Sequence, residues 1–335
     1  MSASPPGPEP DPAPRLHAVA PASAARPRTD PERVLRRLEW TVIRRLDGLL
    51  QGDYRTLFRA FGLDLADLRE YQLHDDVRYI DWNVTARMQI PYVREFHADR
   101  EVTAWFLVDL SGSVDFGSRA VAKRTLATEL VTVLARLLTR HGNRVGALLY
   151  SDRVEHVIPA RGGRRHVLHL LDRMLRQGRA APGKPTDLGE LLECAQSVIK
   201  RRSVVFVVSD FISAPGWPRA LALLARRHEI VAARLYDPLE IELPDLGLLV
   251  LQDAETGEQL FVDTHDRAFR DRFAAGAARR EAQLRAALSE AGVDGIELAT
   301  DDDLVDALVR FTVLRKRRSQ LASGATPTPP GRMPG

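Results

Sequence analysis

The sequence has little of several residue types, and each shortage excludes a class of protein. A single cysteine, Cys194, among 335 residues excludes an internal disulfide framework. No apolar run approaches the roughly 18 residues that a membrane-spanning helix needs. The first residues also lack the basic-then-apolar pattern of a secretory signal. We therefore expect a soluble protein in a reducing cytoplasm.

Lysine is scarce too: only four of the 48 basic residues are lysine, and the others are arginine. Acidic residues number 45, so the net charge is only +3 and no excess of positive charge favours nucleic acid as a partner. We interpret the basic clusters as solvated helix faces; they are Arg36-Arg37, Arg44-Arg45 and Arg315–Arg318. Walker-type and Gly-x-Gly-x-x-Gly fingerprints are missing, so we expect that the chain itself does not hydrolyse ATP.

Composition divides the chain into four parts. Residues 1–30 are rich in proline and are predicted to be a disordered tail, and residues 316–335 are predicted to be a second one. Residues 31–101 are predicted to form an N-terminal subdomain, and residues 102–315 the main domain. The subdomain begins with a predicted amphipathic helix over residues 31–50, because apolar residues recur there at intervals of three or four: Leu35, Leu38, Val42, Leu46 and Leu49.

Short strands are also predicted in the subdomain, at residues 77–82 and 92–96. From residue 102 onward, unbroken apolar runs alternate with helical patterns. The predicted strands are 104–108, 144–150, 154–158, 204–208, 229–235 and 296–298. The predicted helices are 119–140, 164–176, 187–201, 217–227, 265–291 and 301–311. This alternation predicts an α/β fold with a doubly wound, mostly parallel sheet. Residues 248–251 and 259–262 flank Glu-Thr-Gly-Glu and are predicted to form a β-hairpin inserted into this pattern.

Oxygen-bearing side chains follow two of the predicted strands. Asp109, Ser111 and Ser113 follow the 104–108 strand, Asp210 follows the 204–208 strand, and Thr186 lies in the loop before a helix. In a doubly wound sheet, ligands gather at the carboxyl ends of the strands. Oxygen ligands suit a hard divalent cation such as Mg²⁺, or Mn²⁺. The five residues therefore predict a cation site at one edge of the sheet.

Each part of this set also has an ordinary explanation. Asp109 and the serines fit a turn, Thr186 fits a helix N-cap, and Asp210 fits a loop acid. Taken together, they predict a cation that keeps positive charge and an open position for an incoming carboxylate. This favours a binding protein over an enzyme.

Two alternatives remain open. One is a Mg²⁺-dependent phosphohydrolase in which Asp109 is the nucleophile. Haloacid-dehalogenase-type enzymes share the strand-end aspartate but carry a second acid two residues later, where this chain has Ser111. The other alternative is a scaffold with the same fold whose metal site stays empty.

The pattern Asp109-x-Ser111-x-Ser113, with Thr186 and Asp210, resembles the metal-ion-dependent adhesion site of von Willebrand factor A domains. The resemblance covers roughly residues 102–315. It implies that these five residues are metal ligands, some of them through water, and that a Glu or Asp of a partner completes the coordination shell.

A second resemblance lies ahead of this site. It rests on five segments that are similar to the bacterial family called domain of unknown function 58; they are Phe61–Tyr71, Asp75–Arg78, Ile80–Asn83, Thr85–Arg87 and Tyr92–Phe96. This chain departs from the family pattern at His74, where glycine is usual, and at Val114, where methionine is usual. The resemblance implies a non-enzymatic adaptor or substrate-recruiting partner of a MoxR-type AAA+ ATPase.

Overall fold

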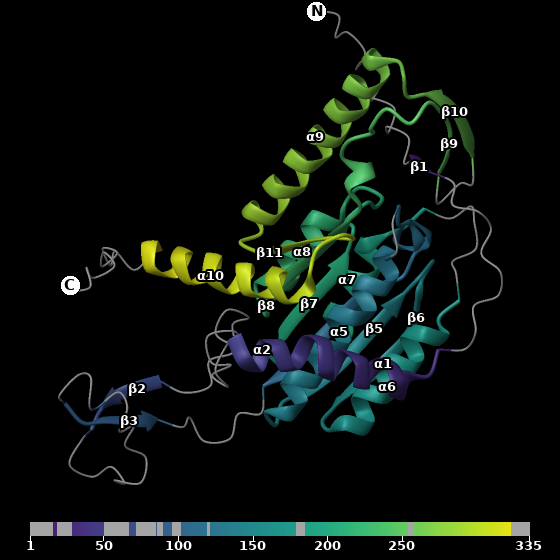
Figure 1. The fold of residues 1–335 in the computed structure, drawn as a ribbon. Helices are drawn as coiled ribbons and strands as arrows, with labels where there is room; N and C mark the ends of the chain where they lie inside the picture. The colour runs from purple at the N-terminus through teal and green to yellow at the C-terminus, as the bar shows by residue number, and fades with distance from the viewer. Residues whose placement is uncertain are drawn as a thin grey trace, which may run out of the picture.

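A computed structural model gives the architecture of the chain (Figure 1). The structure describes residues 16–18, 29–49, 67–71, 85, 90–95, 102–118, 121–178, 185–253 and 258–322. The predicted strand at 77–82 lies outside these residues, as does most of the segment 61–96 that carries the second resemblance.

Six strands form the central sheet, in the order β11-β8-β7-β4-β5-β6 (Figure 1). Their bounds are β4 Thr103–Asp109, β5 Arg144–Tyr150, β6 Val154–Arg161, β7 Val204–Ser209, β8 Glu229–Tyr236 and β11 Asp294–Ala299. Every neighbouring pair is parallel except β5 and β6, which follow each other through a tight turn. The predicted α/β fold with a mostly parallel sheet is confirmed.

Alternate side chains of each strand enter two separate cores, one on each face of the sheet. In β4, Phe106 enters the first core and stacks on Phe206 of β7, with 5.1 Å between the ring centroids. Its neighbours Trp105 and Leu107 enter the second core. Both faces of the sheet are therefore covered, which explains the unbroken apolar runs in its strands.

Helices cover the two faces of the sheet. The first core is closed by α5 Lys123–Arg140, α6 Arg164–Arg176, α10 Leu304–Ala322 and the N-terminal helical segment. The second core is closed by α7 Leu188–Val198, α8 Trp217–Ala225 and the C-terminal part of α9 Arg267–Glu290. This three-layer arrangement leaves the carboxyl ends of β4 and β7 next to each other at one edge.

The N-terminal helical segment contributes to the first core. It consists of α1 Pro31–Leu38, a π-helical turn η1 Glu39–Ile43 and α2 Arg44–Leu49. Leu35, Leu38 and Leu46 are fully buried, and Glu32 pairs with Arg164 of α6 at 2.8 Å. The helix predicted over residues 31–50 is confirmed. Its apolar face shares the core of the sheet and does not form a core of its own.

Small sheets lie outside the central one. The antiparallel hairpin of β9 Leu248–Asp253 and β10 Gln259–Asp263 is confirmed, and β1 Leu16–Ala18 adds a third strand to it. This places residues 16–18, which fall in the tail predicted to be disordered, in a strand. A further pair, β2 Asp67–Glu70 and β3 Tyr92–Glu95, confirms the strand predicted at 92–96.

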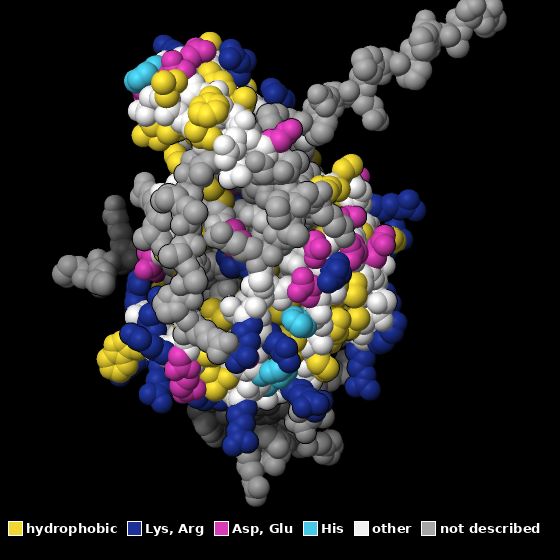
Figure 2. Space-filling model, turned by 90° about the vertical axis from the view of Figure 1, so that its right-hand side faces the viewer, with side chains coloured by type: hydrophobic (Ala, Val, Ile, Leu, Met, Phe, Trp, Pro, Cys, Tyr) yellow, Lys and Arg dark blue, Asp and Glu magenta, His cyan; other side chains and the backbone are white. Residues whose placement is uncertain are grey.

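The hairpin exposes apolar side chains. Leu248 and Phe261 are each 80% exposed, and Figure 2 shows hydrophobic side chains gathered at the top of the molecule, where Figure 1 places this hairpin.

The last helix is longer than its sequence pattern predicts. α10 runs to Ala322, beyond the predicted end at residue 311 and into the range assigned to the C-terminal tail. Residues 314–322 lack an apolar stripe, but Leu, Arg, Lys and Gln are good helix formers and extend the helix without one. Among the described residues, no helix combines the length and the apolar composition that crossing a membrane requires.

Candidate metal centre

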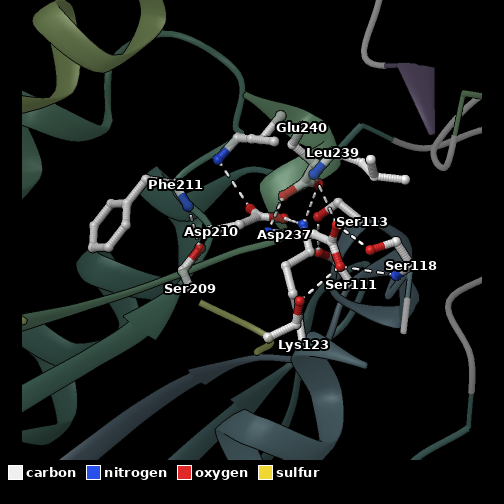
Figure 3. A network of polar contacts seen from close by, with 12 residues as sticks. Ser111, Ser113, Ser118, Lys123, Ser209, Asp210, Phe211, Asp237, Leu239 and Glu240 are labelled. Carbon is white, nitrogen blue, oxygen red and sulfur yellow. Dashed lines mark hydrogen bonds and ion pairs between the residues drawn. The ribbon is translucent and has the colours of Figure 1, made fainter. Parts of the chain in front are cut away.

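The chain leaving β4 brings three of the predicted ligands together. Asp109 ends the strand, and its Oδ1 accepts a hydrogen bond from the backbone N–H of Ser111 at 2.9 Å. A short 3₁₀ turn, η3 Gly112–Asp115, follows and places the hydroxyl of Ser113 3.2 Å from that of Ser111 (Figure 3). Asp109, Ser111 and Ser113 are all buried. One carboxylate and two hydroxyls therefore lie within a few ångströms of one another.

The chain leaving β7 meets this group directly. Ser209, the last residue of β7, donates its hydroxyl hydrogen to Oδ2 of Asp109 at 2.7 Å and accepts from the N–H of Phe211 at 2.9 Å. Asp210 follows and is also buried. The sequence reasoning did not identify Ser209. A serine that ends an otherwise apolar strand, just before a predicted ligand, was the available signal.

Phe211 gives the turn after β7 an unusual backbone. Its φ is +59°, in the left-handed region that L-residues other than glycine avoid at a cost of about 1–2 kcal/mol. The ring is packed against Trp217 with 5.4 Å between centroids, which keeps this side chain in place. The turn lets the N–H of Ile212 donate to Oδ1 of Asp210 at 3.0 Å. The strained turn thus fixes the direction of the Asp210 carboxylate.

Thr186 is held at the same edge by its backbone. Its carbonyl accepts from the N–H of Ala214 at 2.8 Å and from the hydroxyl of Ser213 at 3.1 Å. The next N–H, that of Asp187, donates to the hydroxyl of Tyr150 at the end of β5 at 2.9 Å. The N-cap of α7 is Asp187 and not Thr186, so capping does not explain the threonine. Its loop is tied both to the turn after Asp210 and to the strand beside β4.

Lys123, which the sequence reasoning did not identify, is the basic group of this region. The side chain is fully buried, and its Nζ lies 2.8 Å from Oδ2 of Asp210 and 2.6 Å from Oε1 of Glu240. Burial acts to lower the pKa of Lys123, but the charges of Asp210 and Glu240 outweigh it and hold the pKa above its usual value. A signal was available, because Lys123 stands three residues before Leu126, on the buried stripe of its helix.

Asp237 joins the network through Glu240 (Figure 3). Its carboxylate accepts from the N–H and hydroxyl of Ser118, from the N–H of Leu239, and from the hydroxyl of Thr300. Glu240 in turn accepts from the N–H of Asp237 at 2.9 Å and completes a capping box. Four donors satisfy Asp237, so this aspartate needs no cation.

The carboxylate of Asp109 lies in a different electrostatic environment from that of Asp237. Burial, followed by the negative charge of Asp210, raises its pKa to about 6, although the hydrogen bonds from Ser209 and Ser111 oppose the rise. Within the described part of the chain, no Lys, Arg or His forms an ion pair with this carboxylate. A buried carboxylate without a cationic partner, beside two hydroxyls, fits a hard divalent cation.

Hydroxyl ligands are necessary for such a site. Across the described residues, no group of three or more His, Cys, Asp or Glu side chains is placed to hold a metal ion. The structure brings Asp109, Ser111, Ser113 and Asp210 to the ends of two neighbouring strands and pins the loop of Thr186 at the same edge. That these residues bind a cation stays a prediction.

A family model described as "Protein of unknown function DUF58" matches residues 67–283. The chain belongs to this family. One curated relative is the uncharacterized protein Rv1480 of Mycobacterium tuberculosis, 39% identical over 285 residues, which cover 84% of this chain and 89% of that protein. Another is the uncharacterized protein MAV169 of Mycobacterium avium, 37% identical over 160 residues, which cover 48% of this chain and 94% of that protein. Membership of this DUF58 family, expected from the sequence, is confirmed.

Solved structures give more distant likenesses. The conserved hypothetical protein BatB from Bacteroides thetaiotaomicron is 14% identical with a TM-score of 0.40, covering 66% of this chain and 99% of its own. The SpRpn10 VWA domain is 14% identical with a TM-score of 0.34, covering 62% of this chain and 93% of its own. At such values the likeness concerns the fold alone.

Proposed function

We propose that this DUF58 protein is a non-enzymatic interaction module that binds a divalent cation, Mg²⁺ or Mn²⁺, and through it the acidic side chain of a partner. The observation that supports this most is Asp109, a buried carboxylate that lacks a cationic partner among the described residues and lies beside the hydroxyls of Ser111 and Ser113. Asp210 and Thr186 are the remaining proposed ligands.

The ligand types favour binding over catalysis. Ser111, Ser113 and Thr186 are neutral, so two carboxylates are the only charged ligands in the set. Lys123 already compensates one of these, that of Asp210. A bound cation in this setting keeps positive charge toward an incoming Glu or Asp. This is the property that an acid-recognising site requires.

Burial adds a condition to this proposal. The five side chains are at most 5% exposed, so an incoming carboxylate reaches them only after the loops at this edge have opened. We propose that the structure is the closed form and that partner binding is coupled to opening. For the partner, the family resemblance implies a MoxR-type AAA+ ATPase, with the protein serving as an adaptor in the cytoplasm.

The phosphohydrolase alternative finds less support. Enzymes of the haloacid-dehalogenase type carry a second acid two residues after the aspartate, where this chain has Ser111, and both carboxylate oxygens of Asp109 already accept hydrogen bonds. Hydrolysis of p-nitrophenyl phosphate by the purified chain in Mg²⁺, abolished in Asp109→Asn, would establish the enzyme instead. The empty-scaffold alternative is tested by titration calorimetry with Mg²⁺ and Mn²⁺, which gives no heat of binding if the scaffold is correct.

Affinity capture from the native cell tests the proposal. The full chain is the bait, with Mg²⁺ or with EDTA, and captured proteins are identified by mass spectrometry. We expect EDTA and Asp109→Ala each to abolish capture while the thermal unfolding curve stays cooperative. Asp152→Ala is the matched control, because Asp152 lies in the turn after β5 at the same edge and is not a proposed ligand. Capture that survives both EDTA and Asp109→Ala would show that no metal bridge exists.

A further inference from the structure

Lys123 differs from every other basic residue that the structure describes. It is the only buried Lys or Arg among them, and no part of its side chain is exposed. A lysine is expensive to bury unless its ammonium is paired. Lys123 nonetheless stands at the first helical position of α5, directly beside the proposed cation site. Its place therefore calls for an explanation in terms of the charges around it.

Three carboxylates lie around the ammonium of Lys123; those of Asp109 and Asp210 are buried, and the side chain of Glu240 is 10% exposed. Lys123 contacts Asp210 and Glu240, and the charge of Asp210 in turn acts on Asp109. Arg280 of α9 also interacts electrostatically with Glu240. The ammonium is consequently the one positive charge that contacts a proposed ligand among the described residues. It neutralises Asp210 and leaves Asp109 without compensation.

We propose that Lys123 is a built-in counter-charge that keeps the site folded without a divalent cation and limits how tightly one binds. This inference rests on the proposed function, because it concerns the same site. Two effects follow from one ammonium group. It stabilises Asp210 when no cation is present, and it repels a cation that enters beside Asp210, since like charges repel each other more strongly in a buried site than in water.

A different role for Lys123 predicts the opposite change in cation affinity, so experiment can distinguish the two roles. If Lys123 served only to position Asp210 as a ligand, its loss would weaken cation binding. If it is a competing charge, its loss strengthens cation binding while the metal-free protein becomes less stable. Affinity and metal-free stability would then change in opposite directions.

Titration calorimetry and thermal unfolding of the full chain with MgCl₂ make the test. We expect Lys123→Met to lower the metal-free Tm, to bind Mg²⁺ at least about tenfold more tightly than wild type, and to show a larger rise in Tm with Mg²⁺. Lys123→Met with Glu240→Gln removes one charge of each sign and should return the affinity toward that of wild type. Lys200→Met, at an exposed lysine, is the control and should change neither quantity.

A single substitution that leaves the lysine in place guards against misfolding. Glu240→Gln keeps an acceptor for the N–H of Asp237 but removes one negative charge beside Lys123. We expect it to weaken Mg²⁺ binding about tenfold. An unchanged or tighter affinity in Glu240→Gln would overturn the inference even if Lys123→Met did not fold.

The outcomes separate the inference from the function on which it rests. Tight binding by Lys123→Met and none by wild type would support the counter-charge and overturn the cation-bridge function. Binding by wild type with equal or weaker binding by Lys123→Met would overturn the counter-charge and leave the function standing. Absence of binding in both proteins would overturn both.

Discussion

The two aspartates at the ends of β4 and β7 form a natural comparison. Asp109 ends β4, and Asp210 directly follows the last residue of the neighbouring parallel strand β7; both are buried. A lysine compensates the charge of Asp210, whereas among the described residues Asp109 is held by hydrogen bonds from Ser111 and Ser209 and by no cationic group. Two aspartates at adjoining strand ends thus differ in how their charge is balanced. Asp210 contributes to the stability of the fold, and Asp109 keeps a charge that a cation can neutralise.

The two aspartates should differ most in how the protein's stability responds when each is replaced by asparagine. Asp210→Asn removes one partner of a buried ion pair and should lower the free energy of unfolding by about 3 kcal/mol. Asp109→Asn removes a buried charge without a cationic partner, so the metal-free protein should be equally stable or more stable. Urea unfolding in EDTA measures both. Equal losses in the two variants would show that the aspartates play the same role.

Ser209→Ala should weaken the link between the two strand ends. The change leaves Oδ2 of Asp109 and the N–H of Phe211 without a partner that each now has. We expect a loss of about 2 kcal/mol in the free energy of unfolding and a further rise in the pKa of Asp109. Urea unfolding measures the first and titration by NMR the second. Ser197→Ala, at an exposed serine of α7, should be nearly neutral.

Lowering the pH should neutralise the charge of Asp109. The pKa of Asp109 is raised to about 6 from its usual 3.8, so the folded state binds a proton more tightly than the unfolded state does. The stability of the metal-free protein should therefore rise as the pH falls from 7 toward 5. Mg²⁺ affinity should fall about tenfold between pH 7.5 and pH 5, because the proton competes for the carboxylate.

Asp109→Asn provides the control for this pH dependence. Calorimetric titrations at several pH values measure the affinity of wild type, and unfolding in EDTA measures the stability of both proteins. In Asp109→Asn the stability gain between pH 7 and 5 should be smaller than in wild type. An identical pH dependence in the variant would place the titrating group elsewhere.

The smallest expected effect is that of removing single hydroxyls. Ser111→Ala and Ser113→Ala each remove one neutral proposed ligand and should weaken Mg²⁺ binding roughly fivefold, about 1 kcal/mol. Each also removes the hydrogen bond between the two hydroxyls and should lower the free energy of unfolding by about 1 kcal/mol. Calorimetry gives the affinity, and unfolding in EDTA gives the stability. An unchanged affinity in both variants would exclude these hydroxyls from the coordination shell.

Most of the sheet could be predicted because its strands are buried on both faces. Val204–Ser209 is apolar up to its last residue and was predicted to within one residue. β2, with the sequence Asp-Leu-Arg-Glu, carries no such signal and was not predicted. The end of α10 was also not predicted, because residues 314–322 form a helix without the apolar stripe that marks a helix in a sequence.

The candidate site could be predicted only in part. Asp109 and Asp210 were found because strand ends meet at one edge of a parallel sheet. Lys123 was not, because a lysine at the start of a helix normally faces water, and only the packing of α5 on the sheet buries it. Its position on the stripe of Leu126 and Leu130 was informative, but the charge of the side chain argued against burial.

Closure around Asp109 has a kinetic consequence. Asp109 is fully buried, and Ser111 and Ser113 are at most 2% exposed, so an ion bound as we propose would exchange with solvent only as often as the surrounding loops part. Residence times would then follow the rate of that motion and not the intrinsic lability of a hydrated ion. A chelator added for minutes can leave a bound ion in place, so depletion should proceed overnight before a preparation is treated as metal-free.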